Sequence, residues 1–184
     1  DCPICCLPMP TDPKQFTSKL CCFKFICSGC SIANMRREIA SSLDPSCPFC
    51  RFKDDGEFKK RRLKRIEAND PVAIYYEGFK EYENSNYISA FEWYTKATEF
   101  GYAEAHLKLA AMYYLGRGVE KDKGKEILHL EEAAIDGHPK ARYFLGNEEW
   151  ENGNYERAVK HWIIAATQGE DKSIKILMLA FKDG

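Results

Sequence analysis

The residues of this chain that could do chemistry are its cysteines. All nine lie between Cys2 and Cys50 of a 184-residue chain, in the strings CPIC, CCFKFICSGC and CPFC. Six of them form Cys-x-x-Cys pairs, which are Cys2 with Cys5, Cys27 with Cys30, and Cys47 with Cys50. Such a pair puts two sulfur atoms on one tight turn, where both can hold one metal ion. The spacing therefore predicts a metal-binding segment at residues 1–51.

A disulfide framework is the alternative use of so many cysteines. Such frameworks usually extend over the region that they staple, whereas residues 52–184 contain no cysteine. We therefore favour metal over disulfides or redox thiols, and we expect an intracellular location, cytoplasmic or nuclear. A segment this short buries too little apolar surface to fold on a core alone, and structural zinc would supply the missing stability.

Two zinc ions with four ligands each need more donors than the three pairs provide. Histidine cannot help within this segment, because the first histidine of the chain is His106. The missing ligands must come from Cys6, Cys21 and Cys22. The four histidines show no metal spacing, and we expect surface or half-buried positions for His106, His129, His138 and His161.

Residues 1–51 resemble a RING finger, both in the spacing of CPIC, CCFKFICSGC and CPFCR and in the residues between the cysteines. The resemblance implies a small zinc-stabilised domain of irregular structure, with a short hairpin and one helix. It also implies two interleaved structural zinc sites. The first is Cys2, Cys5, Cys27 and Cys30, and the second is Cys21, Cys22, Cys47 and Cys50. Lys24 stands where the family usually has histidine, so Cys21 would replace that ligand and Cys6 would be the odd thiol.

RING fingers typically dock a ubiquitin-conjugating enzyme and act by proximity, so the resemblance implies no catalytic residue of its own. It places the docking groove at Ile4, Ile32, Met35 and Pro48. It places the residue that can contact both the conjugating enzyme and ubiquitin at Arg51. An alternative for three apolar residues is the small core of a helix from Ile32 to Ser41, and we favour that alternative for Ile32, Met35 and Ile39.

Residues 52–69 form a charged linker. We expect a turn at Asp54–Gly56 and a capping helix over Glu57–Ala68. Within that helix, Lys59–Arg65 holds six basic residues in seven. This run is either a nuclear-import or nucleic-acid patch or the solvated face of a helix whose apolar residues pack on the following repeats. We favour the solvated helix, with Phe58, Leu63 and Ile66 on its packed side.

Residues 70–184 carry a repeat. The strings AIYYEG, AHLKLA and ARYFLG each precede a second helical string, and these second strings close on Gly101, Gly137 and Gly169. Two helices per period of 32 to 36 residues are typical of a helical solenoid. The repeat boundaries are 70–101, 102–137, 138–169 and a partial 170–184. Small residues should let paired helices approach at Gly78, Ala110 and Gly146, and the closing glycines suit left-handed helix caps.

These repeats resemble Sel-one-like repeats, relatives of the tetratricopeptide repeat. The middle one, AEAHLKLAAMYYLGRGVEKDKGKEILHLEEAAIDG, fits best and departs at Glu126, where the family favours a small residue. The resemblance implies an all-α solenoid that binds a protein or peptide. We expect most of the recurring aromatic residues in the core between repeats and one or two on a peptide-binding face. These residues are Tyr75, Tyr76, Trp93, Tyr94, Tyr113, Trp150 and Trp162.

Charge and hydropathy narrow the function classes. The 27 basic and 28 acidic residues nearly cancel, so global electrostatics favour no particular partner. No apolar run is long enough for a membrane span, and we expect no membrane partner. Because the chain lacks an initiator Met and enters a cysteine motif at its second residue, we expect it to be a fragment of a longer chain. The leading hypothesis is a RING-type ubiquitin-protein ligase whose repeats recruit a substrate or adaptor. The alternative is a non-enzymatic zinc-binding scaffold, and nucleic-acid binding is weaker because a basic-aromatic stripe is missing.

Overall fold

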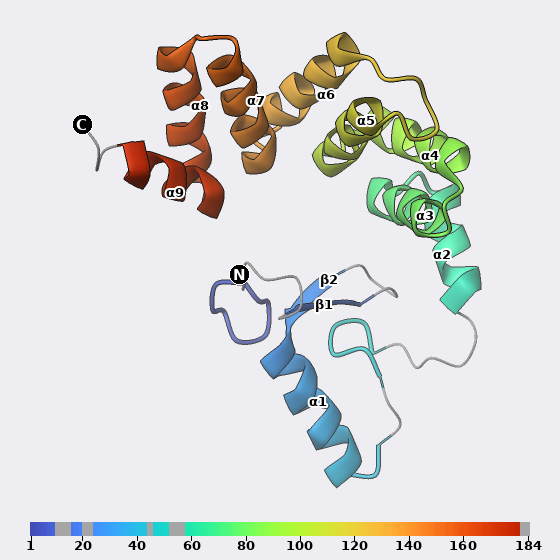
Figure 1. The fold of residues 1–184 in the computed structure, drawn as a ribbon. Coiled ribbons are helices and arrows are strands. Elements are labelled where there is room, and N and C mark those ends of the chain that lie inside the picture. The colour runs from blue at the N-terminus through green and yellow to red at the C-terminus, as the bar shows by residue number, and fades with distance from the viewer. Residues whose placement is uncertain (10–15, 20–23, 44–45, 52–57, 181–184) are drawn as a thin grey trace. The chain divides into compact units, whose positions relative to one another are not determined.

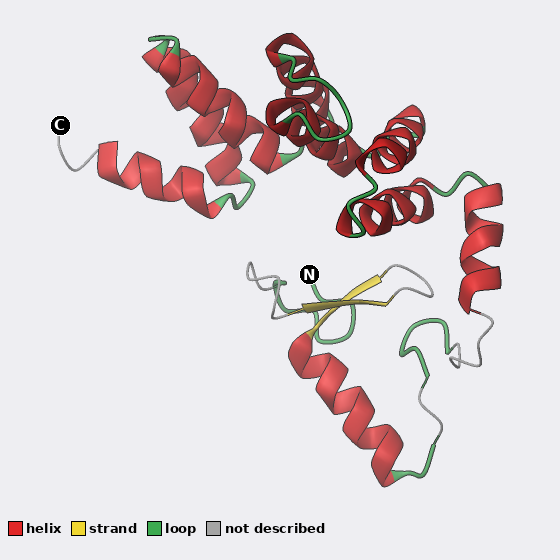
Figure 2. Ribbon diagram, turned by 45° about the vertical axis from the view of Figure 1, so that its right-hand side comes forward, coloured by secondary structure: helices red, strands yellow, loops and turns green. Residues whose placement is uncertain are grey.

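The computed structural model describes residues 1–9, 16–19, 24–43, 46–51 and 58–180. The chain divides into two compact units, Asp1–Ala68 and Asn69–Gly184 (Figure 1). The first unit contains a two-stranded sheet and helices, whereas the described part of the second contains helices and loops only (Figure 2). The turn expected at Asp54–Gly56 lies outside the described residues.

The first unit is built on a hairpin and one helix. Strands β1 (Phe16–Lys19) and β2 (Lys24–Cys27) pair antiparallel, with Phe16 opposite Cys27. Helix α1 (Ser28–Ala40) follows β2 without a loop, and α2 (Phe58–Glu67) closes the unit. The Cys27 sulfur accepts a hydrogen bond from the Cys30 N–H over 3.5 Å. This side-chain cap starts α1 at Ser28, four residues before the predicted start at Ile32.

The apolar residues of α1 point to solvent. Ile32, Met35 and Ile39 are 46, 52 and 72% exposed, so the prediction that they form a small core is wrong. The buried residue of this helix is Glu38, at 5% exposure. Glu38 is turned inward because its carboxylate accepts hydrogen bonds from Ser46, the residue before Cys47.

The second unit is a helical solenoid, as predicted. Its described helices run in the order α3 (Pro71–Glu83), α4 (Tyr87–Glu99), α5 (Ala103–Leu115), α6 (Lys123–Ile135), α7 (Pro139–Glu151), α8 (Tyr155–Thr167) and α9 (Asp171–Ala180). Helices α3 and α4, α5 and α6, and α7 and α8 pack as pairs, and each pair packs on the next (Figure 1). Helix α9 packs on α8 as the first half of a fourth repeat.

Small residues and glycines set the spacing of the repeats. A Cβ atom on Gly78 would lie 2.8 Å from a Tyr94 ring carbon, and one on Gly146 would lie 2.5 Å from Cδ1 of Trp162. These clashes confirm that the paired helices need a residue without a side chain there. The closing glycines have φ angles of +72, +81 and +86°, which confirms their left-handed caps at Gly101, Gly137 and Gly169.

The core of the solenoid is mixed aliphatic and aromatic. One cluster lies at the contact of the second and third repeats and contains Leu107, Ala110, Leu130, Ala133, Ala134, Ala141 and Leu145. Most of the recurring aromatic residues are buried or half-buried, as predicted. Trp150 differs, since 46% of its surface is exposed. None of the helices in the described part of the chain combines the length and apolar character that a membrane span requires.

Candidate functional site

Four cysteine sulfur atoms come together in the first unit. The Sγ atoms of Cys2, Cys5, Cys27 and Cys30 all lie within 4.8 Å of one another. The Cys5 and Cys27 sulfur atoms are 3.9 Å apart. A tetrahedral zinc ion with Zn–S bonds of about 2.3 Å spaces its sulfur ligands about 3.8 Å apart. These four residues could therefore hold one zinc ion after a small contraction.

Two turns of the same geometry present the cysteine pairs. In the first, the Cys6 N–H donates to the Cys2 carbonyl over 2.8 Å, and Cys6 has a φ angle of +57°. In the second, the Arg51 N–H donates to the Cys47 carbonyl over 2.8 Å, and Arg51 has a φ angle of +53°. The strings CPICC and CPFCR thus form matching turns, and the first of them brings the Cys2 and Cys5 sulfur atoms together.

The cluster has the chemistry of a cation site. No disulfide joins any of the cysteines in the described ranges. Backbone hydrogen bonds, first from Cys27 and then from Cys5 and Ile4, lower the pKa of the Cys2 thiol to about 6. The hydrogen bond to Cys27 and burial raise the pKa of the Cys30 thiol to about 12. A thiolate therefore forms readily at Cys2, whereas ionisation of Cys30 would need a central positive charge.

The second predicted set lies partly outside the described residues. Cys21 and Cys22 fall in a part of the chain that the structure does not describe. Their predicted partners are placed, with Cys47 buried and Cys50 half-buried. The Lys24 ammonium lies 5.5 Å from the centre of the Phe49 ring, which brings β2 to the second turn. Cys6 is exposed and stands outside the cluster of four sulfur atoms.

Sequence reasoning missed Glu38, which fixes the second turn to α1. One of its carboxylate oxygens accepts hydrogen bonds from both the N–H and the hydroxyl of Ser46, each over 3.0 Å. Burial opposes ionisation, but the Ser46 hydrogen bonds outweigh it and lower the pKa of Glu38. Ser46 directly precedes Cys47, so this contact sets the position of a predicted ligand. No sequence pattern marks Glu38, since an acidic residue on a short helix is usually solvated.

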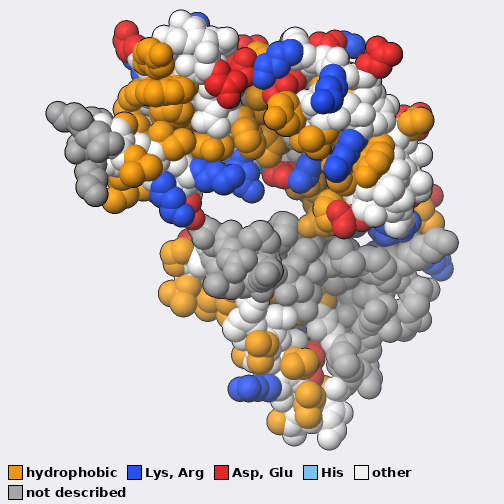
Figure 3. Space-filling view, in the orientation of Figure 1, with side chains coloured by type: hydrophobic (Ala, Val, Ile, Leu, Met, Phe, Trp, Pro, Cys, Tyr) orange, Lys and Arg blue, Asp and Glu red, His pale blue; other side chains and the backbone are white. Residues whose placement is uncertain are grey.

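The predicted partner-binding residues lie at the surface of the first unit. Ile4, Ile32 and Met35 are exposed, Pro48 is half-buried, and Arg51 is exposed. Leu7, Ile39 and Leu43 add further exposed apolar surface that was not assigned to docking. Figure 3 shows hydrophobic side chains spread over α1 on the face turned to the viewer. An exposed apolar patch on so small a unit is typical of a protein-binding surface.

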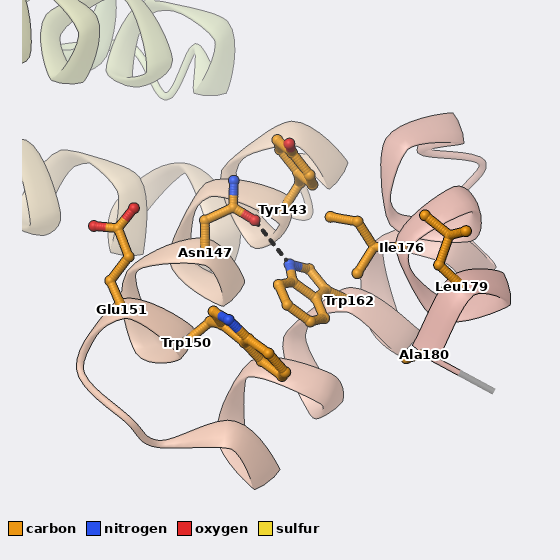
Figure 4. Close-up of a pocket in the computed structure, with 8 residues that line it drawn as sticks. All are labelled: Tyr143, Asn147, Trp150, Glu151, Trp162, Ile176, Leu179 and Ala180. Atoms are coloured by element: carbon orange, nitrogen blue, oxygen red, sulfur yellow. Dashed lines mark hydrogen bonds between the residues drawn. The ribbon is translucent and has the colours of Figure 1, made fainter. Parts of the chain in front are cut away.

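The solenoid carries a second candidate site along its odd-numbered helices. One hollow of about 490 Å³ lies between α7, α8 and α9, with Trp150 and Trp162 in its wall (Figure 4). Another hollow of about 530 Å³ lies between α5, α6 and α7, with Phe144 in its wall. Asn147 and Glu151 line both hollows. The two hollows therefore adjoin at these two residues, and we name the surface that contains both the α5–α7–α9 groove.

Comparison with known families agrees with the repeat pattern. Residues 72–101, 103–138 and 139–170 match the model of the Sel1 repeat. The chain belongs to the Sel1 repeat family. The matched spans lie within two residues of the predicted repeats 70–101, 102–137 and 138–169, so the predicted solenoid is confirmed.

Three solved structures from bacteria are similar to this Sel1 repeat chain. A Sel1 repeat protein from Oxalobacter formigenes is 26% identical with a TM-score of 0.60, and the match covers 78% of this chain and 59% of that one. The protective antigen c5321 of uropathogenic Escherichia coli is 26% identical with a TM-score of 0.61, covering 69% of this chain and 29% of the antigen. Helicobacter pylori cysteine rich protein B, at 22% identity and a TM-score of 0.52, shares the fold, over 67% of this chain and 95% of that one. No curated protein matches the chain.

The Sel1 match starts at residue 72 and does not include the cysteine-rich segment. The candidate metal site in that segment is therefore supported by the positions of its own residues. Within the middle Sel1 repeat, the unusual Glu126 is buried. The Lys123 ammonium lies 3.4 Å from its carboxylate and also pairs with Glu148 of the next repeat. The acidic residue is tolerated at this position because a neighbouring cation neutralises it.

Proposed function

We propose that this protein is an interaction scaffold, in which the Sel1 repeats bind a protein partner and the cysteine-rich unit is held together by structural zinc. The observation that carries the proposal is the α5–α7–α9 groove, two adjoining hollows on a Sel1 solenoid with the exposed aromatic residues Tyr114, Phe144 and Trp150 in their walls. Solenoids of this kind use extended surfaces between repeats to bind polypeptides. The described residues that line the groove are mainly aromatic, aliphatic, amide and carboxylate side chains, which suit recognition of a polypeptide.

The zinc part of the proposal is supported by the four clustered sulfur atoms. Thiolates would fill all four positions of a tetrahedral ion and leave none for water, so the ion would be structural. The predicted second set, Cys21, Cys22, Cys47 and Cys50, belongs to the same proposal. Free thiols at this density persist in reducing compartments, which supports a cytoplasmic or nuclear location.

Affinity capture tests the scaffold proposal. The full chain and a Trp150→Ala variant serve as matched baits, with quantitative mass spectrometry of the captured proteins. We expect at least one protein to be enriched on the wild type and reduced about fivefold or more on the variant, because truncation of a central aromatic residue removes much of the binding energy. The same captured set at the same level on both baits would contradict the assignment of the groove as the binding surface.

A RING-type ubiquitin-protein ligase is the second candidate, and the exposure of Ile4, Ile32 and Met35 favours it. A self-ubiquitination assay with a panel of conjugating enzymes tests this function. Ile4→Ala should weaken docking of the conjugating enzyme by removing apolar contact. Arg51→Ala should leave docking and zinc content nearly unchanged but slow ubiquitin discharge, because the guanidinium would hold the charged complex in its reactive arrangement. Lack of discharge by the wild type with every conjugating enzyme would favour the scaffold alone.

A further inference from the structure

The junction of the two hollows carries two polar groups with no partner among the described residues, the Asn147 amide nitrogen and the Glu151 carboxylate. Asn147 Oδ1 accepts a hydrogen bond from the Trp162 indole N–H over 3.1 Å. This bond fixes the amide and turns its nitrogen away from Trp162 (Figure 4). Glu151 lies on the opposite side of Asn147 from Ile176 and Leu179 (Figure 4) and forms no ion pair with any residue of the described part. The junction thus offers an oriented amide donor and a carboxylate.

The charges that line the groove are unbalanced. Glu126 and Glu148 share the single ammonium of Lys123. The other lysine of the lining, Lys108, lies 3.6 Å from Glu104 and is already paired. Glu151 adds a third carboxylate to the lining without adding a cation. The groove therefore presents excess negative charge at the point where its two hollows meet, and a cationic group would complement it.

Apolar surface flanks this charge on both sides. On one side, Tyr114 and Phe144 are exposed in the hollow between α5 and α7. On the other side, Trp150 and Leu179 are exposed in the hollow between α7 and α9. Each hollow is large enough for one large side chain.

We propose that the α5–α7–α9 groove binds a peptide segment in which a lysine or arginine separates two large apolar side chains. The cation pairs with Glu151, the two apolar side chains fill the two hollows, and the Asn147 amide donates to a backbone carbonyl of the peptide. The inference deepens the proposed scaffold function, on which it rests, by naming the class of partner.

A set of peptide pools tests this assignment on the zinc-loaded full chain. Three fluorescent pools of nonapeptides have random flanking residues and a fixed central lysine, norleucine or glutamate, and binding is followed by fluorescence polarisation. We expect the lysine pool to bind the wild type about five- to tenfold more tightly than the glutamate pool. Glu151→Gln should reduce this ratio to about twofold or less, and Glu151→Lys should reverse it. Glu99→Gln, a matched change at an exposed glutamate outside the groove, should leave the ratio unchanged.

The outcomes separate this inference from the function on which it rests. Equal binding of the three pools, reduced in a Phe144→Ala variant, overturns the cationic partner and leaves the scaffold function in place. The same lysine preference in the wild type and in Glu151→Gln also overturns the assignment of Glu151. No binding of any pool, with helical circular dichroism intact, counts against both proposals. If sedimentation shows concentration-dependent dimers, and if dimer formation displaces the peptide pools, then the groove binds a second copy of this chain. That result overturns the assignment to a foreign peptide.

Discussion

The Nδ1 atoms of His106 and His129 lie 3.0 Å apart and join α5 to α6. The two residues are far apart in sequence, and their rings are half-buried, with centres 5.3 Å apart. His129 also stacks on Tyr113 at an interplanar angle of 15°. At most one proton can occupy the space between the two nitrogen atoms, so the contact requires at least one neutral ring.

This contact predicts a loss of stability in acid. Burial, and then the charge of His106, lower the pKa of His129 from 6.5 to about 4. Burial also lowers the pKa of His106, although the negative charges of Glu132 and Asp136 act in the opposite direction. The unfolded chain binds these protons more readily than the folded chain does. The stabilisation that the neutral histidine pair gives to the fold is therefore present above pH 6.5 and is lost as the pH falls toward 4. We expect an effect on the order of 1–2 kcal/mol, since both rings are partly solvated. Urea unfolding of wild type and His129→Gln at about pH 7.5 and about pH 5 measures it. Equal pH dependence in the two proteins would contradict the role of the pair.

The close approach at Gly146 predicts a cost for a single added methyl group. Gly146→Ala would push a Cβ atom into the Trp162 indole and disturb the hydrogen bond of that indole to Asn147. We expect the free energy of unfolding to fall by about 1–3 kcal/mol, despite the better helix propensity of alanine. Gly124→Ala is the matched control, because a Cβ atom there meets only the Asp122 carboxylate at 3.4 Å. That variant should be neutral or slightly more stable in the same urea titration, and equal losses in both would refute a specific clash.

The clustered sulfur atoms predict which cysteine holds metal. Atomic absorption should find about two zinc ions per wild-type chain. Cys5→Ser should lose one ion, because Cys5 belongs to the cluster of four sulfur atoms. Cys6→Ser is the neighbouring control and should keep both ions, since Cys6 is exposed and outside the cluster. Loss of an ion in Cys6→Ser would make Cys6 a ligand and leave Cys21 or Cys22 free.

Removal of zinc is expected to unfold one unit only. The chain forms two compact units, and the solenoid has its own core around Leu130 and Leu145. A chelator should therefore abolish amide protection of β2 and α1 while that of α5 to α8 persists, as followed by hydrogen exchange. Simultaneous loss of protection in both units would show that they depend on one shared core.

The buried contact of Glu38 with Ser46 predicts a positioning role. Glu38→Ala would leave the Ser46 N–H and hydroxyl without their acceptor, at a cost of about 1–3 kcal/mol. We expect faster release of zinc to a chromogenic chelator, with a smaller effect in Ser46→Ala, which removes only one of the two hydrogen bonds. Arg36→Ala changes an exposed residue of the same helix and serves as the control. Release at the wild-type rate from Glu38→Ala would refute this role.

Local chemistry in the sequence determined the solenoid and the cysteine pairs. Each Sel1 repeat carries its own helix periodicity, a small residue and a closing glycine, and these act over a few residues. Gly78, Gly101 and Gly146 could therefore be interpreted without knowledge of distant contacts. The turns of CPIC and CPFC are also local, because two cysteines two residues apart share one turn whatever surrounds them.

Contacts between distant residues were decided only by the tertiary structure. Periodicity suggested a core for Ile32, Met35 and Ile39, but the inner face of α1 meets Ser46 through Glu38, so these three side chains are exposed. Trp150 repeats the position of buried aromatic residues, yet it lines a groove, since a helix face is buried only where a neighbouring helix covers it. The pairing of His106 with His129 and the meeting of two hollows at Glu151 likewise depend on how successive helices pack, which no single segment of sequence encodes.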